Sequence, residues 1–296
     1  MVSASPVSRP AWVGAVNALT GSHGAVRRSP VELVANAASV VTHSPYAEAT
    51  GISHGRLGRW TDGVAELRAA RVEFAGYWAA HNDRVLSQRD RALRRGEAPD
   101  PLWAVLGDST AQGLGAPSPD GGYVGQALDA MRRRTGLPWQ VLNLSASGSL
   151  IRDVLHRQLP RLPASADLVT CGIGVNDILY TGPGKLFADL RALLAAVPDH
   201  TIVLDLPLPD GYGGLIGRAG RPYVARINRT LYEAAASRGL PVATVSAHFQ
   251  PPWAGKLASD CFHPSQDGYR DWTRALLATL DARTAQDPQL AADAAA

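Results

Sequence analysis

Five short apolar runs recur along the chain from residue 102 onward, and stretches with helical periodicity separate them. Each run has the length of a buried strand and shows little polar alternation, which is typical of strands that are covered on both faces. We expect strands at Leu102–Leu106, Val141–Leu144, Leu168–Cys171, Thr201–Leu206 and Val242–Val245. We expect helices at Tyr123–Thr135, Ile151–Gln158, Lys185–Ala196, Tyr223–Arg238 and Gln266–Ala282.

The alternation of strands and helices predicts an α/β fold in which a five-stranded parallel sheet lies between two layers of helices. Ligands of such sheets bind at the carboxyl ends of the strands. The residues that directly follow each apolar run are therefore where catalytic or binding side chains are expected.

A helical pattern without strands precedes the sheet region. Apolar residues there recur at spacings of three, four and seven, which places them on one face of a helix. They are Val64, Leu67, Phe74, Trp78 and Val85. Gly96 and two prolines follow and end the pattern. We expect one long amphipathic helix at about 62–95 that packs on the domain after it.

Three parts of the chain follow from these patterns. Residues 1–98 form an N-terminal extension, residues 99–285 form the α/β domain, and residues 286–296 form a disordered tail. The first 60 residues give no predicted element and no role. Gly51–Gly55 matches the G-x-S-x-G nucleophile motif, but no buried strand precedes it and no helix follows, so we reject it as a catalytic site.

The composition is that of a folded protein, with 46% hydrophobic residues and 19% charged residues among 296. Only two cysteines are present, which excludes a disulfide scaffold. The net charge of +3 gives no basic patch, so we expect no nucleic-acid partner. No apolar stretch is long enough to span a membrane, and no secretory signal is recognisable. We therefore expect a cytoplasmic protein with reduced thiols.

Chemically useful residues follow four of the predicted strands. The first strand is followed by Gly107–Thr110, the second by Asn143–Ser149, the third by Gly172–Asp177 and the fifth by Asp260–Pro264. Each segment alone is typical of an ordinary turn. Together they bring a serine, backbone amides, a carboxamide and an Asp/His pair to one edge of one sheet.

These four motifs, in this order, resemble the SGNH (GDSL) hydrolase family over about Pro101–Leu280. The clearest departure is Thr110, where the family most often has leucine. The resemblance implies a flavodoxin-like three-layer α/β/α sandwich and makes residues 99–285 an SGNH hydrolase domain. It also implies a lipase or esterase activity.

The resemblance assigns a role to each matching position. Ser109 matches the nucleophile, His263 its base and Asp260 the residue that orients the base. Gly148 and Asn176 match the oxyanion hole, to which the Ser109 N–H also belongs. Chemistry agrees with these roles, because a serine hydroxyl becomes a good nucleophile only when a base takes its proton. The charge that develops on the carbonyl oxygen also needs preorganised donors.

We therefore expect a serine esterase that hydrolyses a small-molecule acyl ester through an acyl-enzyme, without a cofactor or a metal. An acyltransferase that passes the acyl group to a sugar or alcohol hydroxyl is the first alternative. A non-catalytic binding module is a more distant one. The acyl chain length, the alcohol part and the oligomeric state cannot be read from the sequence.

Residues beside these motifs have simpler interpretations. Asp108 and Asp177 are expected to hydrogen-bond loop backbone. Cys171 and Cys261 are expected to be small buried fillers, although a disulfide between them is left open. The glycine-rich segment Pro207–Arg221 is expected to be a mobile lid or a wall of the acyl pocket. Two aromatic residues near the Asp/His motif could line that pocket, namely Trp253 and Phe262.

Overall fold

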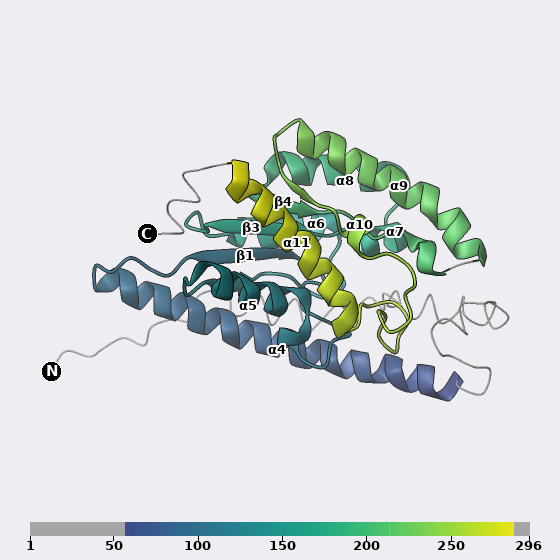
Figure 1. Cartoon of the computed structure of the whole chain (residues 1–296), viewed down its shortest axis with the longest axis horizontal. Coiled ribbons are helices and arrows are strands. Elements are labelled where there is room, and N and C mark those ends of the chain that lie inside the picture. The colour runs from purple at the N-terminus through teal and green to yellow at the C-terminus, as the bar shows by residue number, and fades with distance from the viewer. Residues whose placement is uncertain (1–56, 213, 287–296) are drawn as a thin grey trace.

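Five short strands form a sheet at the centre of the protein in a computed structural model, which describes residues 57–212 and 214–286 (Figure 1). The strands are β1 Leu102–Gly107, β2 Gln140–Asn143, β3 Leu168–Gly172, β4 Thr201–Leu204 and β5 Val242–Ala243. They lie in the order β2-β1-β3-β4-β5, with parallel neighbours throughout. The predicted α/β class and the five-stranded parallel sheet are confirmed.

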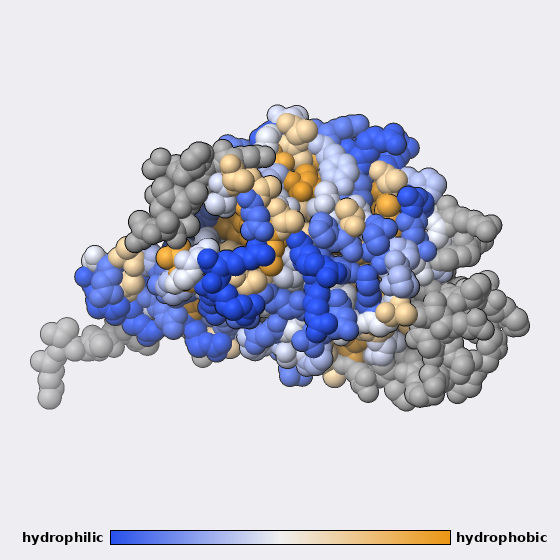
Figure 2. Space-filling view, viewed as in Figure 1, coloured by the Kyte–Doolittle hydropathy of each residue, from blue (hydrophilic) through white to orange (hydrophobic). Residues whose placement is uncertain are grey.

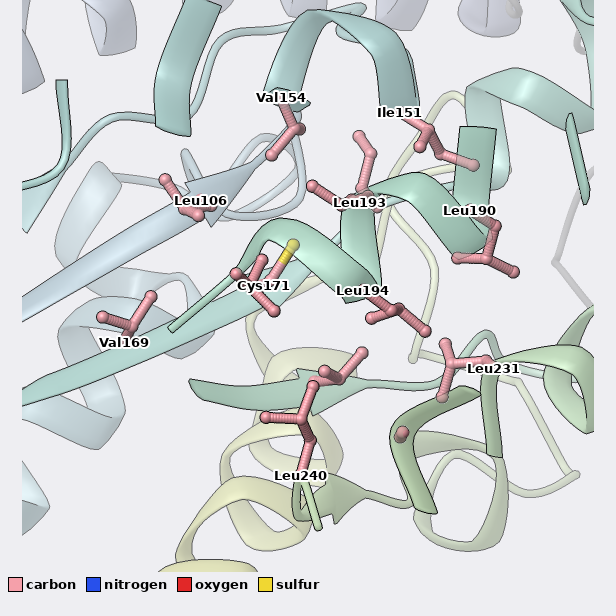
Figure 3. Close-up of a cluster of buried hydrophobic side chains, with 14 of the residues drawn as sticks. Leu106, Ile151, Val154, Val169, Cys171, Leu190, Leu193, Leu194, Leu231 and Leu240 are labelled. Atoms are coloured by element: carbon pink, nitrogen blue, oxygen red, sulfur yellow. The ribbon is translucent and has the colours of Figure 1, made fainter. Parts of the chain in front are cut away.

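Both faces of the sheet are apolar, because successive side chains of a strand point to opposite faces. In β1, Leu102 and Leu106 belong to a buried cluster on one face. Trp103 and Val105 belong to a second cluster on the other face. Figure 3 shows the first cluster, to which Leu193 of a neighbouring helix also belongs.

Helices cover both faces of the sheet, which confirms the three-layer arrangement (Figure 1). One layer contains α8 Pro183–Ala196 and α9 Gly214–Ala236, and the other contains α5 Tyr123–Thr135 and α11 Gln266–Gln286. Three shorter helices are α6 Ile151–Asp153, α7 Val175–Tyr180 and α10 Val245–His248. α6 continues as π-helical residues Val154–Gln158.

The long helix α4 spans Leu57–Arg94 and covers the open edge of β2. An edge strand leaves backbone N–H and C=O groups without a strand partner. Here the Asn82 side chain bonds both backbone groups of Asn143, at 2.7 Å to its oxygen and 2.9 Å to its nitrogen. His81 Nε2 lies 3.1 Å from the Val141 oxygen. The side chains of α4 therefore take the place of a further strand.

The predicted amphipathic stripe of this helix is buried from Leu67 to Val85, as expected. The boundaries drawn at residues 98 and 285 stay predictions. Residues 1–56 and 287–296, with the rejected Gly51–Gly55 motif among them, lie outside the described residues.

The segment Pro207–Arg221 contains more helix than predicted, because the helix expected from Tyr223 begins earlier; its role as a mobile lid or a wall of the acyl pocket stays a prediction. Pro209–Tyr212 is a 3-10 turn, and α9 already begins at Gly214. The glycines of this segment disfavour a helix in isolation. However, α9 packs on the turn, and Gly217 lies so close to it that a Cβ atom would stand 3.1 Å from the Pro209 oxygen. Tertiary packing thus outweighs the weak helix propensity.

β4 and β5 are also shorter than predicted, because backbone groups after them find other partners. After β4, the Leu206 N–H donates to Asn228 Oδ1 at 2.9 Å instead of to a neighbouring strand. Asn228 Nδ2 in turn donates to the Leu206 oxygen at 2.8 Å. After β5, the chain enters α10 at Val245.

The surface in the view of Figure 1 is largely hydrophilic, with hydrophobic residues in smaller areas between (Figure 2). A few large hydrophobic side chains are exposed in the described residues, among them Val72 and Leu93 of α4. None of the described helices combines the length and apolar character that crossing a membrane would require.

Candidate active site

The chain runs from β1 outward to β2 and then returns to β3 on the other side of β1. At such a point the loops after neighbouring strands leave in opposite directions and form a crevice beyond the carboxyl ends of the strands. Ser109 lies two residues after β1, and Asn176 lies at the start of α7 after β3. The motif residues therefore gather where ligands of such sheets bind.

Ser109, His263 and Asp260 form one hydrogen-bonded series. His263 Nε2 lies 2.9 Å from Ser109 Oγ, although the two residues are 154 positions apart. On the other side of the ring, His263 Nδ1 lies 2.5 Å from Asp260 Oδ2. All three side chains are buried. The structure thus brings these three residues together in the order acid, imidazole, hydroxyl.

A tight loop fixes the position of the Asp260 carboxylate relative to the His263 imidazole. Asp260 Oδ1 accepts the N–H groups of Phe262 and His263, both at 3.0 Å. Ala258 N donates to the His263 oxygen at 2.8 Å, which closes the loop. Burial opposes the charge of Asp260, but the facing imidazole and these hydrogen bonds outweigh it and hold the pKa of Asp260 below its usual value.

The loop after β2 makes a tight turn at Gly148. Ser149 N donates to the Ala146 oxygen at 3.1 Å, and Gly148 has a φ of 79°, where a side chain would be strained. Asn143 supports the start of this loop, because its Oδ1 accepts the Ser145 N–H at 3.1 Å. The Gly148 amide therefore lies in a loop with a defined backbone.

Asn176 connects the loops after β1 and β2. Its Nδ2 donates to the Ser149 oxygen at 3.0 Å and, at the longer distance of 3.3 Å, to Asp108 Oδ2. The side chain is buried. Asn176 therefore contacts the residue before Ser109 as well as the residue after Gly148, which brings all five predicted site residues into one neighbourhood.

The two acidic neighbours bond the backbone, as predicted. Asp108 Oδ1 accepts the Thr110 N–H at 3.0 Å, and Asp177 Oδ2 accepts the Ile151 N–H at 2.9 Å. Burial raises the pKa of Asp108 despite its hydrogen bonds. Burial also raises the pKa of Asp177, to about 6, against the hydrogen bonds from Ile151 and Thr181.

Two glutamines that sequence reasoning did not identify support the site. Gln158 pairs with both backbone groups of Gly107, at 2.9 Å to the nitrogen and 2.8 Å to the oxygen. Gln112 donates to the Ser145 oxygen at 3.1 Å and accepts from Ser147 Oγ at 2.5 Å. The sequence gives no signal for them, since Gln158 directly follows His156 and Arg157 and Gln112 lies in the polar segment after β1. Both are buried, so their amides hold the loops rather than face solvent.

Aromatic residues surround the Asp/His loop. The Phe262 ring meets the His263 ring edge to face at 5.1 Å. Trp253 is buried and packs on Tyr212 at 4.9 Å. The Tyr212 hydroxyl donates to the Cys261 oxygen at 3.3 Å, which ties the turn before α9 to the Asp/His loop.

The cysteines do not pair with each other. Cys171 is a free and fully buried thiol at the end of β3, and Cys261 is buried in the loop that carries His263. Burial raises the pKa of Cys171 to about 12, which keeps it a neutral filler. Within the described residues, no three His, Cys, Asp or Glu side chains gather as a group that could hold a metal ion.

Comparisons with known proteins agree with this arrangement. Solved structures with the same fold include the lipase Lip_vut3 from a goat rumen metagenome, at 18% identity and a TM-score of 0.52, covering 60% of this chain and 97% of the lipase. TesA matches at 24% identity and a TM-score of 0.50, covering 60% of this chain and 97% of TesA. A variant of the acetyl xylan esterase Axe2 from Geobacillus stearothermophilus matches at 22% identity and a TM-score of 0.50, covering 60% of this chain and 94% of Axe2.

At these identities the structural likeness establishes the flavodoxin-like SGNH fold alone. No curated protein sequence matches the chain. The family model of the GDSL-like lipase/acylhydrolase family, in contrast, matches residues 105–270, which is more than half of the chain. The chain belongs to the GDSL-like lipase/acylhydrolase family and is a carboxylic ester hydrolase.

Proposed function

We propose that the protein is a serine esterase in which Ser109, His263 and Asp260 act as a catalytic triad. The observation that carries this proposal is the continuous series of hydrogen bonds from Asp260 through His263 to the Ser109 hydroxyl. A series of this kind is what nucleophilic catalysis by serine needs, because the base must reach the hydroxyl and a third group must orient the base.

In the first step, Ser109 Oγ attacks the carbonyl carbon of the ester while His263 Nε2 accepts the hydroxyl proton. The electron pair of the carbonyl bond moves onto the carbonyl oxygen. Asp260, which is held ionised by the facing imidazole and its hydrogen bonds, stabilises the imidazolium that forms. The tetrahedral adduct then reforms its carbonyl and breaks the bond to the alcohol oxygen, which takes the proton from His263.

The resulting acyl-enzyme then reacts with water by the same two kinds of step. Water is now the attacking group, and Ser109 Oγ is the leaving group. His263 takes a proton from the water, whose oxygen attacks the acyl carbon. Collapse of the second adduct releases the acid and returns the proton to Ser109 Oγ. An alcohol or sugar hydroxyl in place of water would give acyl transfer, so both reactions share one intermediate.

The oxyanion of each adduct is stabilised by the N–H groups of Ser109 and Gly148 and by the carboxamide of Asn176. Neutral donors that are fixed in advance stabilise such an oxyanion without reorganising. The longer of the two Nδ2 contacts of Asn176, at 3.3 Å to Asp108, is the one that an oxyanion would replace. The contact to the Ser149 oxygen would keep the carboxamide in place.

The test is labelling with a fluorophosphonate together with a p-nitrophenyl ester series from acetate to palmitate. The parent protein should be labelled at Ser109 and should release p-nitrophenol. Ser109→Ala should lose labelling and lower kcat by more than about 10⁴-fold with an unchanged circular dichroism spectrum. Labelling of another residue in the parent, or retained turnover in the variant, would refute the triad. Added alcohol acceptors would show the ratio of transfer to hydrolysis.

A further inference from the structure

The peptide between Ser147 and Gly148 has two ends with different roles. Its N–H end is the proposed oxyanion donor of Gly148, and its C=O end is the oxygen of Ser147. Because a peptide unit is planar, these two groups point in opposite directions and turn together. Whatever holds the Ser147 oxygen therefore also sets the direction of the Gly148 N–H.

This peptide is the middle one of a β-turn. The Ser149 N–H bonds the Ala146 oxygen, and Gly148 occupies the third position with a φ of 79°. Ser147 is not among the residues with positive φ in the described part of the chain, so the turn is of type II. Type I and type II turns differ mainly by a flip of this middle peptide, and glycine at the third position tolerates both.

Arg71 of α4 holds the oxygen end of this peptide. Its Nη2 donates to the Ser147 oxygen at 2.8 Å and lies 3.2 Å from where a Cβ atom of Gly148 would stand. A hydrogen bond from a charged donor is about twice as strong as a neutral one. Of the described residues, no carboxylate forms an ion pair with Arg71; its guanidinium hydrogen-bonds the turn and interacts electrostatically with the Tyr180 side chain.

Other side chains of the same helix fix Arg71 relative to the loop. Trp78 Nε1 donates to the Gln112 oxygen at 2.9 Å, and Asn82 bonds the backbone of Asn143. Arg71, Trp78 and Asn82 are spaced by seven and four residues, which places them on one face of a helix. The helix thus contacts the loop after β2 near its start and at its turn.

We propose that Arg71 is a positioning residue that locks the Ser147–Gly148 peptide in the orientation in which the Gly148 N–H faces the oxyanion. The proposal rests on the proposed role of Gly148. It assigns to helix α4, which lies before the family-matched residues 105–270, a direct part in the catalytic geometry. Without Arg71, the turn can flip and withdraw one of three donors.

The test compares Arg71→Met with Arg91→Met, which removes an exposed arginine farther along α4. Arg71→Met should lower kcat for a p-nitrophenyl ester by about 10- to 100-fold, somewhat less than the loss of an oxyanion donor, and leave KM within about twofold. A boronic acid, which forms a tetrahedral anion on serine, should bind more weakly by the same factor. Arg71→Lys, which keeps a charged donor, should recover part of kcat, and Arg91→Met should behave as the parent.

Three results would overturn the proposal. They are an unchanged kcat in Arg71→Met, a rise in KM alone, or equal losses in Arg71→Met and Arg71→Lys. A rise in KM confined to anionic esters would mean that Arg71 binds substrate directly.

If Arg71→Met does not fold, Arg71→Gln, which retains a neutral donor, takes its place. Arg71→Gln should show an intermediate kcat with unchanged KM, and a parent-like kcat would refute the role. Fluorophosphonate labelling of the parent separates these outcomes from failure of the triad.

Discussion

At single positions, the buried carboxyl of Asp177 couples folding to pH. Burial raises its pKa from the ordinary value of 3.8 to about 6, although Ile151 and Thr181 donate hydrogen bonds to it. Between these two values the folded chain holds a proton that the unfolded chain has lost. The contribution of protonated Asp177 to the stability of the fold is therefore complete below about pH 4 and is lost as the pH rises through about 6.

Asp177→Asn removes this dependence and keeps a compatible hydrogen-bond pattern, because the amide oxygen can accept from Ile151 and the amide nitrogen can donate to Thr181. The free energy of unfolding of the parent, relative to that of the variant, should fall by up to about 1.4 kcal/mol per pH unit between pH 4 and 6. Urea titrations at several pH values measure it. A difference that stays constant with pH would contradict the raised pKa.

The sequence predicted the residues whose chemistry has a recognisable spacing. Asp260 and His263 lie three positions apart before the last predicted helix, and Ser109 follows the first apolar run after Gly107 and Asp108, so the motifs and their order point to them. Arg71 and Gln158 belong to no such motif, because their hydrogen bonds go to backbone groups that only the fold brings near them. A sequence pattern does not record which backbone oxygen a distant side chain will reach.

Among the helices and strands, α4 contributes stability by closing the edge of β2. Asn82 satisfies one backbone N–H and one backbone C=O of Asn143, and all of these groups are buried. A buried backbone group that loses its partner costs about 1–3 kcal/mol. The contact of α4 with the sheet thus involves polar pairing as well as the apolar stripe.

Asn82→Ala should lower the free energy of unfolding by roughly 2–4 kcal/mol, because two buried backbone groups lose their partner. Asn82→Asp keeps the acceptor for the Asn143 N–H, loses the donor to the Asn143 oxygen and adds a buried charge. Ala79→Ser, on the same helix but without a bond to β2, serves as the control and should change stability little. Urea unfolding measures all three, and a cost below about 0.5 kcal/mol for Asn82→Ala would contradict the edge role.

Buried strands were predictable because the five apolar runs have four to six residues each, which is the length of a strand and too short for a typical helix. The start of α9 was not, because it depends on packing against Pro209–Tyr212 and not on the propensities of its own residues. The π-helical residues Val154–Gln158 are another such case. The sequence predicted a regular helix there, and the polar contacts of Gln158 with Gly107 are tertiary.

At the scale of the complete fold, the site depends on a close approach between two distant loops. Gly115 follows β1, and a Cβ atom on it would stand 2.4 Å from the Pro264 oxygen and 2.9 Å from the His263 Cβ. No real Cβ atom tolerates such distances, so the loop that carries His263 would have to move. The distance between His263 Nε2 and Ser109 Oγ thus depends on the absence of a side chain at position 115.

Gly115→Ala should therefore lower kcat by at least about tenfold, because a displacement near 1 Å at the reacting groups can cost about 10²-fold. Gly96→Ala is the matched control. Gly96 also has a positive φ, of 72° against 96° for Gly115, but nothing lies within 4 Å of its added Cβ. Gly96→Ala should lower the free energy of unfolding by about 1 kcal/mol, because of backbone strain, and keep the parent kcat. Equal kcat in the two variants, each measured well below its unfolding temperature, would show that the approach at Gly115 does not set the distance between Ser109 and His263.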